Sequence, residues 1–200
     1  MAEKVNITIK PKHRVTKGHY GYIYDQKRRL VIRTAVLAAG IIGLVVIGYI
    51  VTKTTKNLMS LGGILTAIPM AMQLAQLIAY WKFQGRPEAE YEEIKDIVGE
   101  GVLDTDLVIA KRDGKSIPVN YACFTEEEIF CFTEDSSLRI RDYTEYLHTF
   151  LRLSKVDCEI RLFNDLNAFK GTIKKQSFPS RSDVSDTVLE REGVFRAISM

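Results

Sequence analysis

Two acidic residues come closest to a catalytic pattern in this sequence. Asp104 and Asp106 stand near the start of a strand-like stretch, residues 102–110, and are separated by a single residue. Neighbouring carboxylates can hold a divalent cation, and such a cation activates water or stabilises a phosphate. The next strand-like stretch, residues 117–124, contains no acid that would complete the ligand set. We therefore interpret Asp104 and Asp106 as polar positions of a strand and expect no metal site.

The order of elements expected around these acids resembles the core of restriction-endonuclease-like folds. From residue 87 onward the pattern predicts a helix, three strands, a helix and a fourth strand. The resemblance implies an acid on one strand and an acid-x-Lys pair on the next, which together bind a metal ion. Asp104 and Asp106 fit the first position, but Asp113 and Lys115 fall in the turn between the strands. The resemblance is therefore limited to topology, and a divergent membrane-tethered nuclease is kept as an alternative function.

Histidine and cysteine offer no further catalytic arrangement. The three histidines are scattered along the chain, and the three cysteines lack the spacing of a metal or redox motif. The sequence also lacks a phosphate-binding glycine loop, an HExxH zinc motif and a GxSxG nucleophile motif. We expect buried thiols, no cofactor, and a protein that is not an enzyme. The residues concerned are His13, His19, His148, Cys123, Cys131 and Cys158.

Two long uncharged segments precede the part of the chain that contains these acids and cysteines. Residues 34–52 and 58–81 contain no charged side chain over nineteen and twenty-four positions. At about 1.5 Å per helical residue, the shorter segment reaches about 28 Å, which matches the hydrocarbon core of a bilayer. Only residues 53–57 separate the two segments, so the helices must run antiparallel. The pattern predicts a transmembrane helical hairpin over residues 34–81 and hence an integral membrane protein.

Charge is distributed unevenly before and after the hairpin. Residues 1–33 form a basic N-terminal arm with nine Lys or Arg and two acids. Residues 82–200 carry seventeen Lys or Arg and twenty-three acids. The positive-inside rule places both termini in the cytoplasm, at the cell membrane. The compact two-helix plan is typical of a prokaryotic protein, and we do not expect binding to nucleic acid. The basic residues expected to contact anionic headgroups at the membrane surface are Lys27, Arg28, Arg29 and Arg33.

Small residues recur at four-residue spacing in both uncharged segments. This spacing lets the backbone of a second helix approach closely. The small residues predict helix packing, and we favour packing inside the hairpin over packing between subunits. The predicted packing positions are Ala39, Gly43, Gly63, Ala67, Ala71 and Ala75.

The remaining residues, 82–200, predict a cytoplasmic α+β domain with the element order αβββαβα. Alternating and helical periodicities predict a sandwich of helices on one sheet, in which three strands form an antiparallel meander. Ser136 or Ser137 and Asn164 are expected to cap two of the helices, and residues 184–198 suggest a final one. In the basic arm, residues 5–9 and 20–24 predict two short strands.

The sequence favours an interaction protein. We expect a membrane-anchored cytoplasmic interaction or scaffold domain, acting as an accessory subunit of a membrane complex. Its partners would be the lipid bilayer and either another protein or further copies of the chain. Besides the divergent nuclease, a membrane effector that senses a ligand remains as an alternative.

Overall fold

The computed structural model describes residues 15–54, 57–110, 116–135, 139–154, 156 and 158–199. These residues contain six helices and four strands in two compact units. The hairpin unit is Ile23–Gln84, and the sheet unit comprises Met1–Tyr22 together with Gly85–Met200. The helices are α1 (Tyr22–Thr52), α2 (Leu58–Trp81), α3 (Glu88–Val98), α4 (Ile140–Leu153), α5 (Leu166–Ile173) and α6 (Asp186–Ile198). The strands are β1 (Val102–Ala110), β2 (Ser116–Phe124), β3 (Glu128–Phe132) and β4 (Glu159–Phe163).

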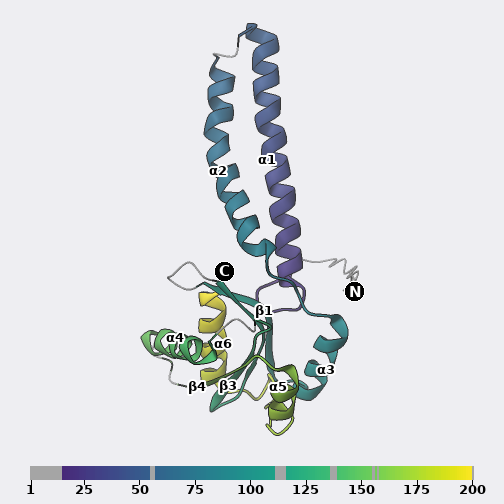
Figure 1. Ribbon diagram of the computed structural model, residues 1–200, viewed down its shortest axis with the longest axis vertical. Helices are drawn as coiled ribbons and strands as arrows, with labels where there is room; N and C mark the ends of the chain where they lie inside the picture. Colours follow the sequence, from purple (N-terminus) through teal and green to yellow (C-terminus); the bar gives the residue numbers. More distant parts are fainter. Residues whose placement is uncertain are drawn as a thin grey trace. The chain divides into compact units, whose positions relative to one another are not determined.

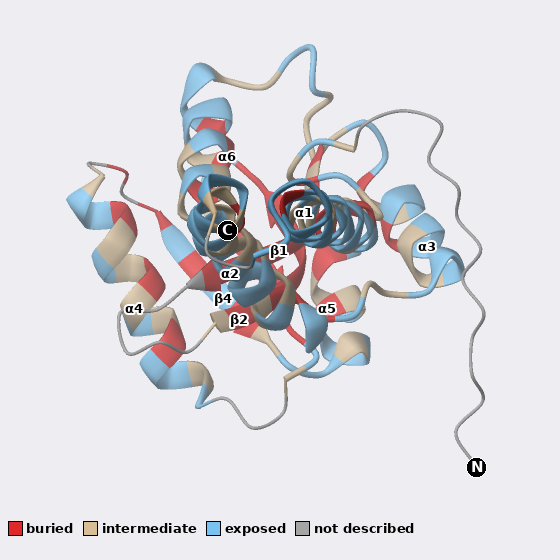
Figure 2. Ribbon diagram, turned by 90° about the horizontal axis from the view of Figure 1, so that it is seen from above, coloured by how far each residue is buried: buried red, intermediate tan, exposed pale blue. Residues whose placement is uncertain are grey.

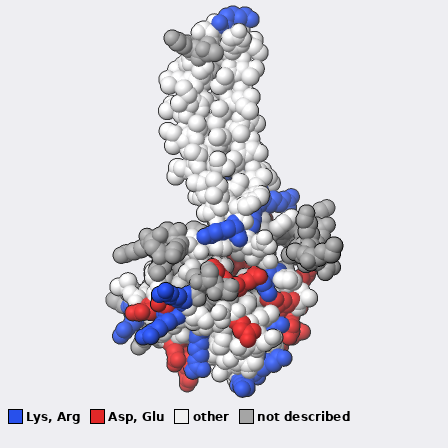
Figure 3. Space-filling view, viewed as in Figure 1, with Lys and Arg blue, Asp and Glu red and all other residues white. Residues whose placement is uncertain are grey.

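The hairpin unit consists of α1 and α2, two helices that are long and apolar enough to cross a membrane. Figure 3 shows their surface white, without charged groups, over most of its length. Asn57 begins α2, since its side chain accepts a hydrogen bond from the Ser60 backbone at 2.8 Å. The same side chain donates to the Thr52 hydroxyl at 3.0 Å, which joins the two ends of the turn.

Helix α1 begins twelve residues before the uncharged segment does. The strand predicted for residues 20–24 is wrong, because the chain is helical from Tyr22 onward. Lys and Arg are good helix formers, so the helix continues through residues 22–33 although this stretch carries several charges. The absence of charge predicts a membrane-compatible segment, not the end of the helix.

The four strands form one mixed sheet in the order β1-β2-β3-β4. The first three strands are antiparallel neighbours, and β4 pairs with β3 in parallel. A parallel neighbour requires a crossover connection, and α4 lies within that connection. The predicted order of helices and strands in this unit is confirmed, with α6 as the additional C-terminal helix (Figure 1).

Helices cover both faces of the sheet. On one face α4 and α6 pack through Leu147 and Phe195, and on the other α3 and α5 pack through Ile94 and Phe169. Each of these side chains is completely buried. Buried and exposed residues alternate along α4 in Figure 2, as expected for an amphipathic helix on a sheet. The helices therefore form two layers, with the sheet between them.

The side-chain alternation of β1 changes phase near its middle. Val102 faces the α4–α6 side, and so do Leu107 and Ile109, although strict alternation would place Val102 and Leu107 on opposite faces. The change occurs next to Asp106, which has a positive φ of 57°. The pairing register with β2 is the same on both sides of this point. Asp104 and Asp106 are therefore brought into different surroundings.

Two cap predictions are wrong in detail. Helix α4 starts later than predicted, and its N-cap residue is Arg139 rather than a serine. Helix α5 is capped by the side chain of Asp165, one residue after the predicted Asn164. Capping residues cluster in such loops, so the sequence predicts a helix start only to within a few residues. The strand predicted at residues 5–9 and the turn at residues 112–115 lie outside the described residues.

Candidate functional site: the strap and the buried ion pairs of β1

A short segment before α1 covers the outer edge of β1. We call residues 16–21 the strap. Gly18 in the strap forms an antiparallel bridge with Thr105, whose backbone N–H donates to the Gly18 carbonyl at 2.9 Å. Ser199, near the C-terminus, forms a second bridge with Ile109. Lys17 joins the two covering segments, because its ammonium group donates to the Ser199 carbonyl at 2.6 Å.

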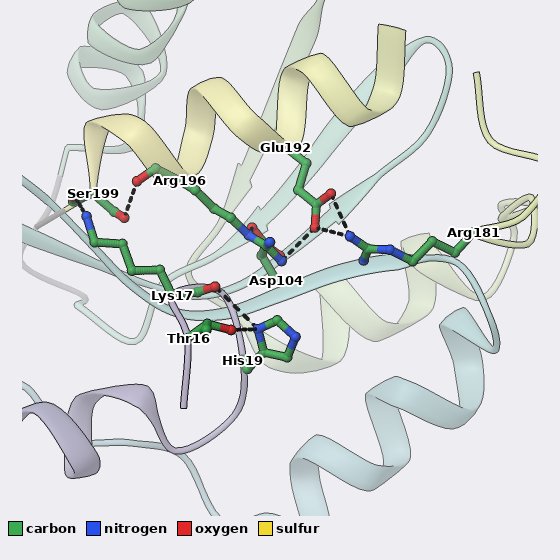
Figure 4. Close-up of polar contacts among 8 residues, drawn as sticks. All are labelled: Thr16, Lys17, His19, Asp104, Arg181, Glu192, Arg196 and Ser199. Carbon is green, nitrogen blue, oxygen red and sulfur yellow. Dashed lines mark hydrogen bonds and ion pairs between the residues drawn. The ribbon is translucent and has the colours of Figure 1, made fainter. Parts of the chain in front are cut away.

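Beneath the strap, the side chain of Asp104 is completely buried and bound by Arg196 of α6. The guanidinium group contacts both carboxylate oxygens, at 2.6 Å from Nη2 to Oδ1 and 2.9 Å from Nε to Oδ2. The same Nη2 atom lies 2.6 Å from Oε1 of Glu192, whose side chain is also buried. Arg181 contacts both oxygens of Glu192 at 3.0 Å (Figure 4). The result is a chain of two carboxylates and two guanidinium groups.

Gly18 fits directly against this chain of charges. Its φ of 84° lies in the left-handed region, which side chains other than glycine rarely adopt. A Cβ atom at this position would lie 2.5 Å from Nε of Arg196 and 2.7 Å from Oδ1 of Asp104. Glycine is therefore required both for the backbone conformation and for the close approach of the strap to the ion pair.

The electrostatics of Asp104 are dominated by its burial. Burial raises its pKa to about 7, because removal from water penalises the charged form more than Arg196 stabilises it. Glu192 raises the pKa further through like-charge repulsion. One guanidinium group thus faces two acids that are both withdrawn from solvent.

The second half of the strap is held through Asp106 and Tyr20. The Gly21 N–H donates to the Asp106 carboxylate at 2.8 Å. The Tyr20 hydroxyl donates to the Arg86 carbonyl at 2.9 Å, and its ring stacks on Tyr91 with 4.5 Å between centroids. Burial raises the pKa of Tyr20 to about 12, so the phenol is neutral and remains a donor. The chain segments before and after the hairpin unit are thus joined on the sheet unit.

Arg86 fixes the second of these segments. Its guanidinium group contacts Glu90 of α3 and lies 2.8 Å from Glu134, which follows β3. The backbone N–H of Glu134 donates to Asn120 Oδ1 on β2 at 2.8 Å. Arg86 therefore connects the start of α3 with the segment that follows β3.

The acids that the sequence singled out are both engaged in structural contacts. Asp104 is bound by Arg196, and Asp106 accepts the strap N–H. On the neighbouring strand, the position opposite Asp106 is Asn120 rather than an acid. In the described residues, no three His, Cys, Asp or Glu side chains converge on a position where they could hold a metal ion. The geometry of both acids supports attachment of the strap.

The other chemical candidates are three cysteines and the histidines. Cys123, Cys131 and Cys158 are buried and free of disulfides. His19 belongs to the strap and contacts the Thr16 hydroxyl at 3.0 Å. His148 lies on α4, far along the sequence from the strap.

The basic residues next to the hairpin differ in their surroundings. The Lys27 ammonium group donates to the backbone carbonyls of Trp81 and Phe83, the first at 3.1 Å, at the end of α2. Arg29 forms an ion pair with Asp25 one turn earlier in α1. Arg28 and Arg33 are exposed. Lys27 therefore joins the two helices, whereas the contact of the exposed arginines with lipid headgroups remains a prediction.

The predicted packing residues are partly buried and partly exposed within the hairpin unit. Gly63 is buried, and a Cβ there would lie 3.4 Å from Val45 of α1. Gly43 and Ala67 are half-buried, while Ala39, Ala71 and Ala75 are exposed. The role of this row in packing remains a prediction.

The closest approach near the turn involves a residue that the spacing did not reveal. A Cβ at Gly48 would lie 2.9 Å from Cβ of Met59 and 2.7 Å from Asn57. Gly48 does not belong to the four-residue row, so spacing alone could not identify it. Its position five residues before the turn is the only signal in the sequence.

Several residues of the strap site were also missed from sequence. Arg196 and Glu192 are separated from Asp104 by about half of the chain, and no local pattern connects them. The stretch Gly18-His-Tyr-Gly21 offered one signal, because two glycines three residues apart indicate unusual backbone conformations. Both glycines do have positive φ angles.

Comparisons with protein-family models, curated proteins and solved structures gave no significant match. The function proposed below therefore depends on the chain's own residues.

Proposed function

We propose that this protein is a two-pass membrane protein whose sheet unit is a cytoplasmic interaction module, a scaffold or accessory subunit of a membrane complex. Helices α1 and α2 supply the two apolar segments that such an anchor needs. The exposed Arg28 and Arg33 favour a location of both chain termini in the cytoplasm, beside anionic lipid headgroups.

The observation that carries this proposal is the attachment of both connecting segments to the sheet unit. An anchor that only localises an enzyme works through a flexible linker. Here the segment before the hairpin is built into the edge of β1, and the segment after it is held by the hydrogen bond from Tyr20 to the Arg86 carbonyl. A sheet unit that incorporates both flanking segments suits an interaction module more than an enzyme tethered by a free linker.

Photo-crosslinking in intact cells tests the proposal. A photoreactive amino acid at Leu153 of α4, which is 76% exposed, or at the exposed Glu92 of α3 should give discrete products with one membrane partner or with a second copy. The matched control is Ile64, an exposed apolar residue of α2 that should react mainly with lipid. Absence of discrete products from surface positions around the sheet unit would contradict an interaction module.

The divergent nuclease is a second candidate, because the observed order of helices and strands keeps its topological resemblance. It requires metal-dependent cleavage of nucleic acid by the purified full chain. Asp106→Ala should then abolish cleavage, whereas Tyr20→Phe, which disturbs the strap without removing a carboxylate, should retain it. This pattern of cleavage would favour the nuclease over the interaction module.

A further inference from the structure

We propose that Asp104 and Glu192 form a buried binding site for one proton, closed by the strap. The two carboxyl groups contact the same nitrogen, Nη2 of Arg196, each at 2.6 Å. Their nearest oxygens are therefore no more than about 5.2 Å apart, twice the distance to that shared nitrogen. The site adds a ligand, the proton, to the proposed function.

Arg196 and Arg181 match two ionised acids in number, but the two cations are not equally withdrawn from water. Two carboxylates with side chains 0% and 5% exposed would share the single guanidinium group of Arg196. The second cation, Arg181, is 51% exposed and so compensates less, because water screens it. The negative charge of Glu192 at this separation disfavours ionisation of Asp104 in a dry environment, so Asp104 is the group that holds the proton.

The other titratable groups near Asp104 do not compensate the charge of its carboxylate. Cys123 on β2 is a neutral thiol, because burial and the nearby Asp104 raise its pKa. On the strap, Lys17 is bound to the Ser199 carbonyl, and His19 is exposed at the surface. Asp106, two residues along β1, adds a further acid and accepts the Gly21 N–H. The pKa of Asp104, raised to about 7 mainly by burial, agrees with a proton that is held up to neutral pH.

The strap covers the site, so proton occupancy and strap position are linked. Gly18 approaches both Arg196 and Asp104 so closely that no side chain fits between them. With the proton bound, the closed arrangement contains one buried carboxylate for the guanidinium group of Arg196. Loss of the proton leaves an additional buried negative charge, which water would stabilise better than the closed site. The closed strap is therefore favoured below about pH 7 and weakened as the pH rises through this value.

The sign of the stability effect follows from the same shift. The pKa of Asp104 is raised in the folded protein, to about 7 from 3.8. The folded state thus binds more protons than the unfolded state between these values. Stability is greatest below the lower value and is lost as the pH rises through the upper one.

Thermal unfolding of the full chain in mild detergent between pH 6 and pH 8 tests the proton site. The unfolding midpoint should fall with rising pH, and Asp104→Asn should abolish this fall, since the amide mimics the neutral carboxyl group. A variant in which His13, His19 and His148 are replaced by Gln should keep it, because histidines titrate in the same range. A fall that persists in both Asp104→Asn and Glu192→Gln would overturn the proposal, as would a wild-type midpoint that does not change.

Arg181→Gln provides a second test that does not disturb the closed core. Removing this exposed cation should strengthen proton binding up to tenfold. The pH of half-loss, at which half of the fall in the unfolding midpoint has occurred, should then rise by up to one unit. Arg181→Lys should restore the wild-type value. The rate of tryptic cleavage after Lys17 at pH 8 measures how often the strap opens. This rate should be lower in Asp104→Asn than in the wild type. An unchanged or lowered pH of half-loss in Arg181→Gln, or equal cleavage rates, would contradict the proposal.

Discussion

The two glycines of the strap provide a matched pair for measuring what the buried ion pair contributes. Gly18 and Gly21 have nearly the same φ, 84° and 82°. A Cβ at Gly18 would collide with Arg196 and Asp104, whereas a Cβ at Gly21 would meet no heavy atom within 4 Å. Alanine at either position causes the same backbone strain, so the difference between the two variants isolates the ion pair.

The expected magnitudes follow from these contacts. Alanine in the left-handed region costs about 1–2 kcal/mol, which is the whole effect expected for Gly21→Ala. Gly18→Ala must also displace the guanidinium group from a carboxylate that is completely buried, and breaking a buried pair costs about 3–5 kcal/mol. The end of Arg196 is 25% exposed and can retreat towards solvent, so we expect the additional cost to be about 2–3 kcal/mol.

Pulsed alkylation of the native cysteines in the full chain measures this difference without complete denaturation. Cys123, Cys131 and Cys158 are buried, so a thiol reagent reaches them only when the sheet unit opens. When opening is faster than labelling, the rate follows the population of the open state, and 1.4 kcal/mol corresponds to a factor of ten. Gly18→Ala should therefore be labelled about 30- to 150-fold faster than Gly21→Ala. Equal rates in the two variants would refute the reasoning that the strap closes over an ion pair.

Two further predictions concern the hairpin unit. Lys27→Met should lower the resistance of the hairpin to denaturing detergent by about 1–2 kcal/mol, because it removes a cation from the end of α2, while Lys27→Arg and the exposed control Arg28→Met should change it little. Lys53→Cys, in the exposed turn, should react with a membrane-impermeant thiol reagent in intact cells, and a cysteine appended after the last residue should react only in opened cells. The opposite labelling pattern would reverse the proposed orientation. An unchanged resistance to detergent in Lys27→Met would show that this ammonium group does not stabilise the hairpin.

The order of the elements could be predicted because it depends on local periodicity. The uncharged segments indicated the positions of α1 and α2, and the alternating stretches indicated β1 and β2. Each of these features is encoded in one continuous stretch of the sequence. The parallel pairing of β4 with β3, in contrast, joins strands from separate parts of the chain.

The candidate site could not be predicted, because its residues meet only through tertiary packing. Asp104 drew attention as an acid in a strand, but its partner Arg196 lies on the C-terminal helix. The role of Gly18 depends on both, since its missing side chain matters only where the ion pair lies. Asp106 showed the same limit: its carboxylate binds a backbone N–H of the strap and not a second acid.

The sheet unit is assembled from two stretches of chain that are interrupted by the whole hairpin unit. A fragment beginning at Gly85 would lack the strap, and the outer edge of β1 would then present backbone groups that other chains can pair with, a common route to aggregation. The Tyr20 hydroxyl already reaches the Arg86 carbonyl, so the ends of the two stretches lie close together. A soluble form of this unit for crystallisation or solution studies should therefore keep residues 15–22 and join them to Gly85 through a short flexible linker in place of Ile23–Gln84.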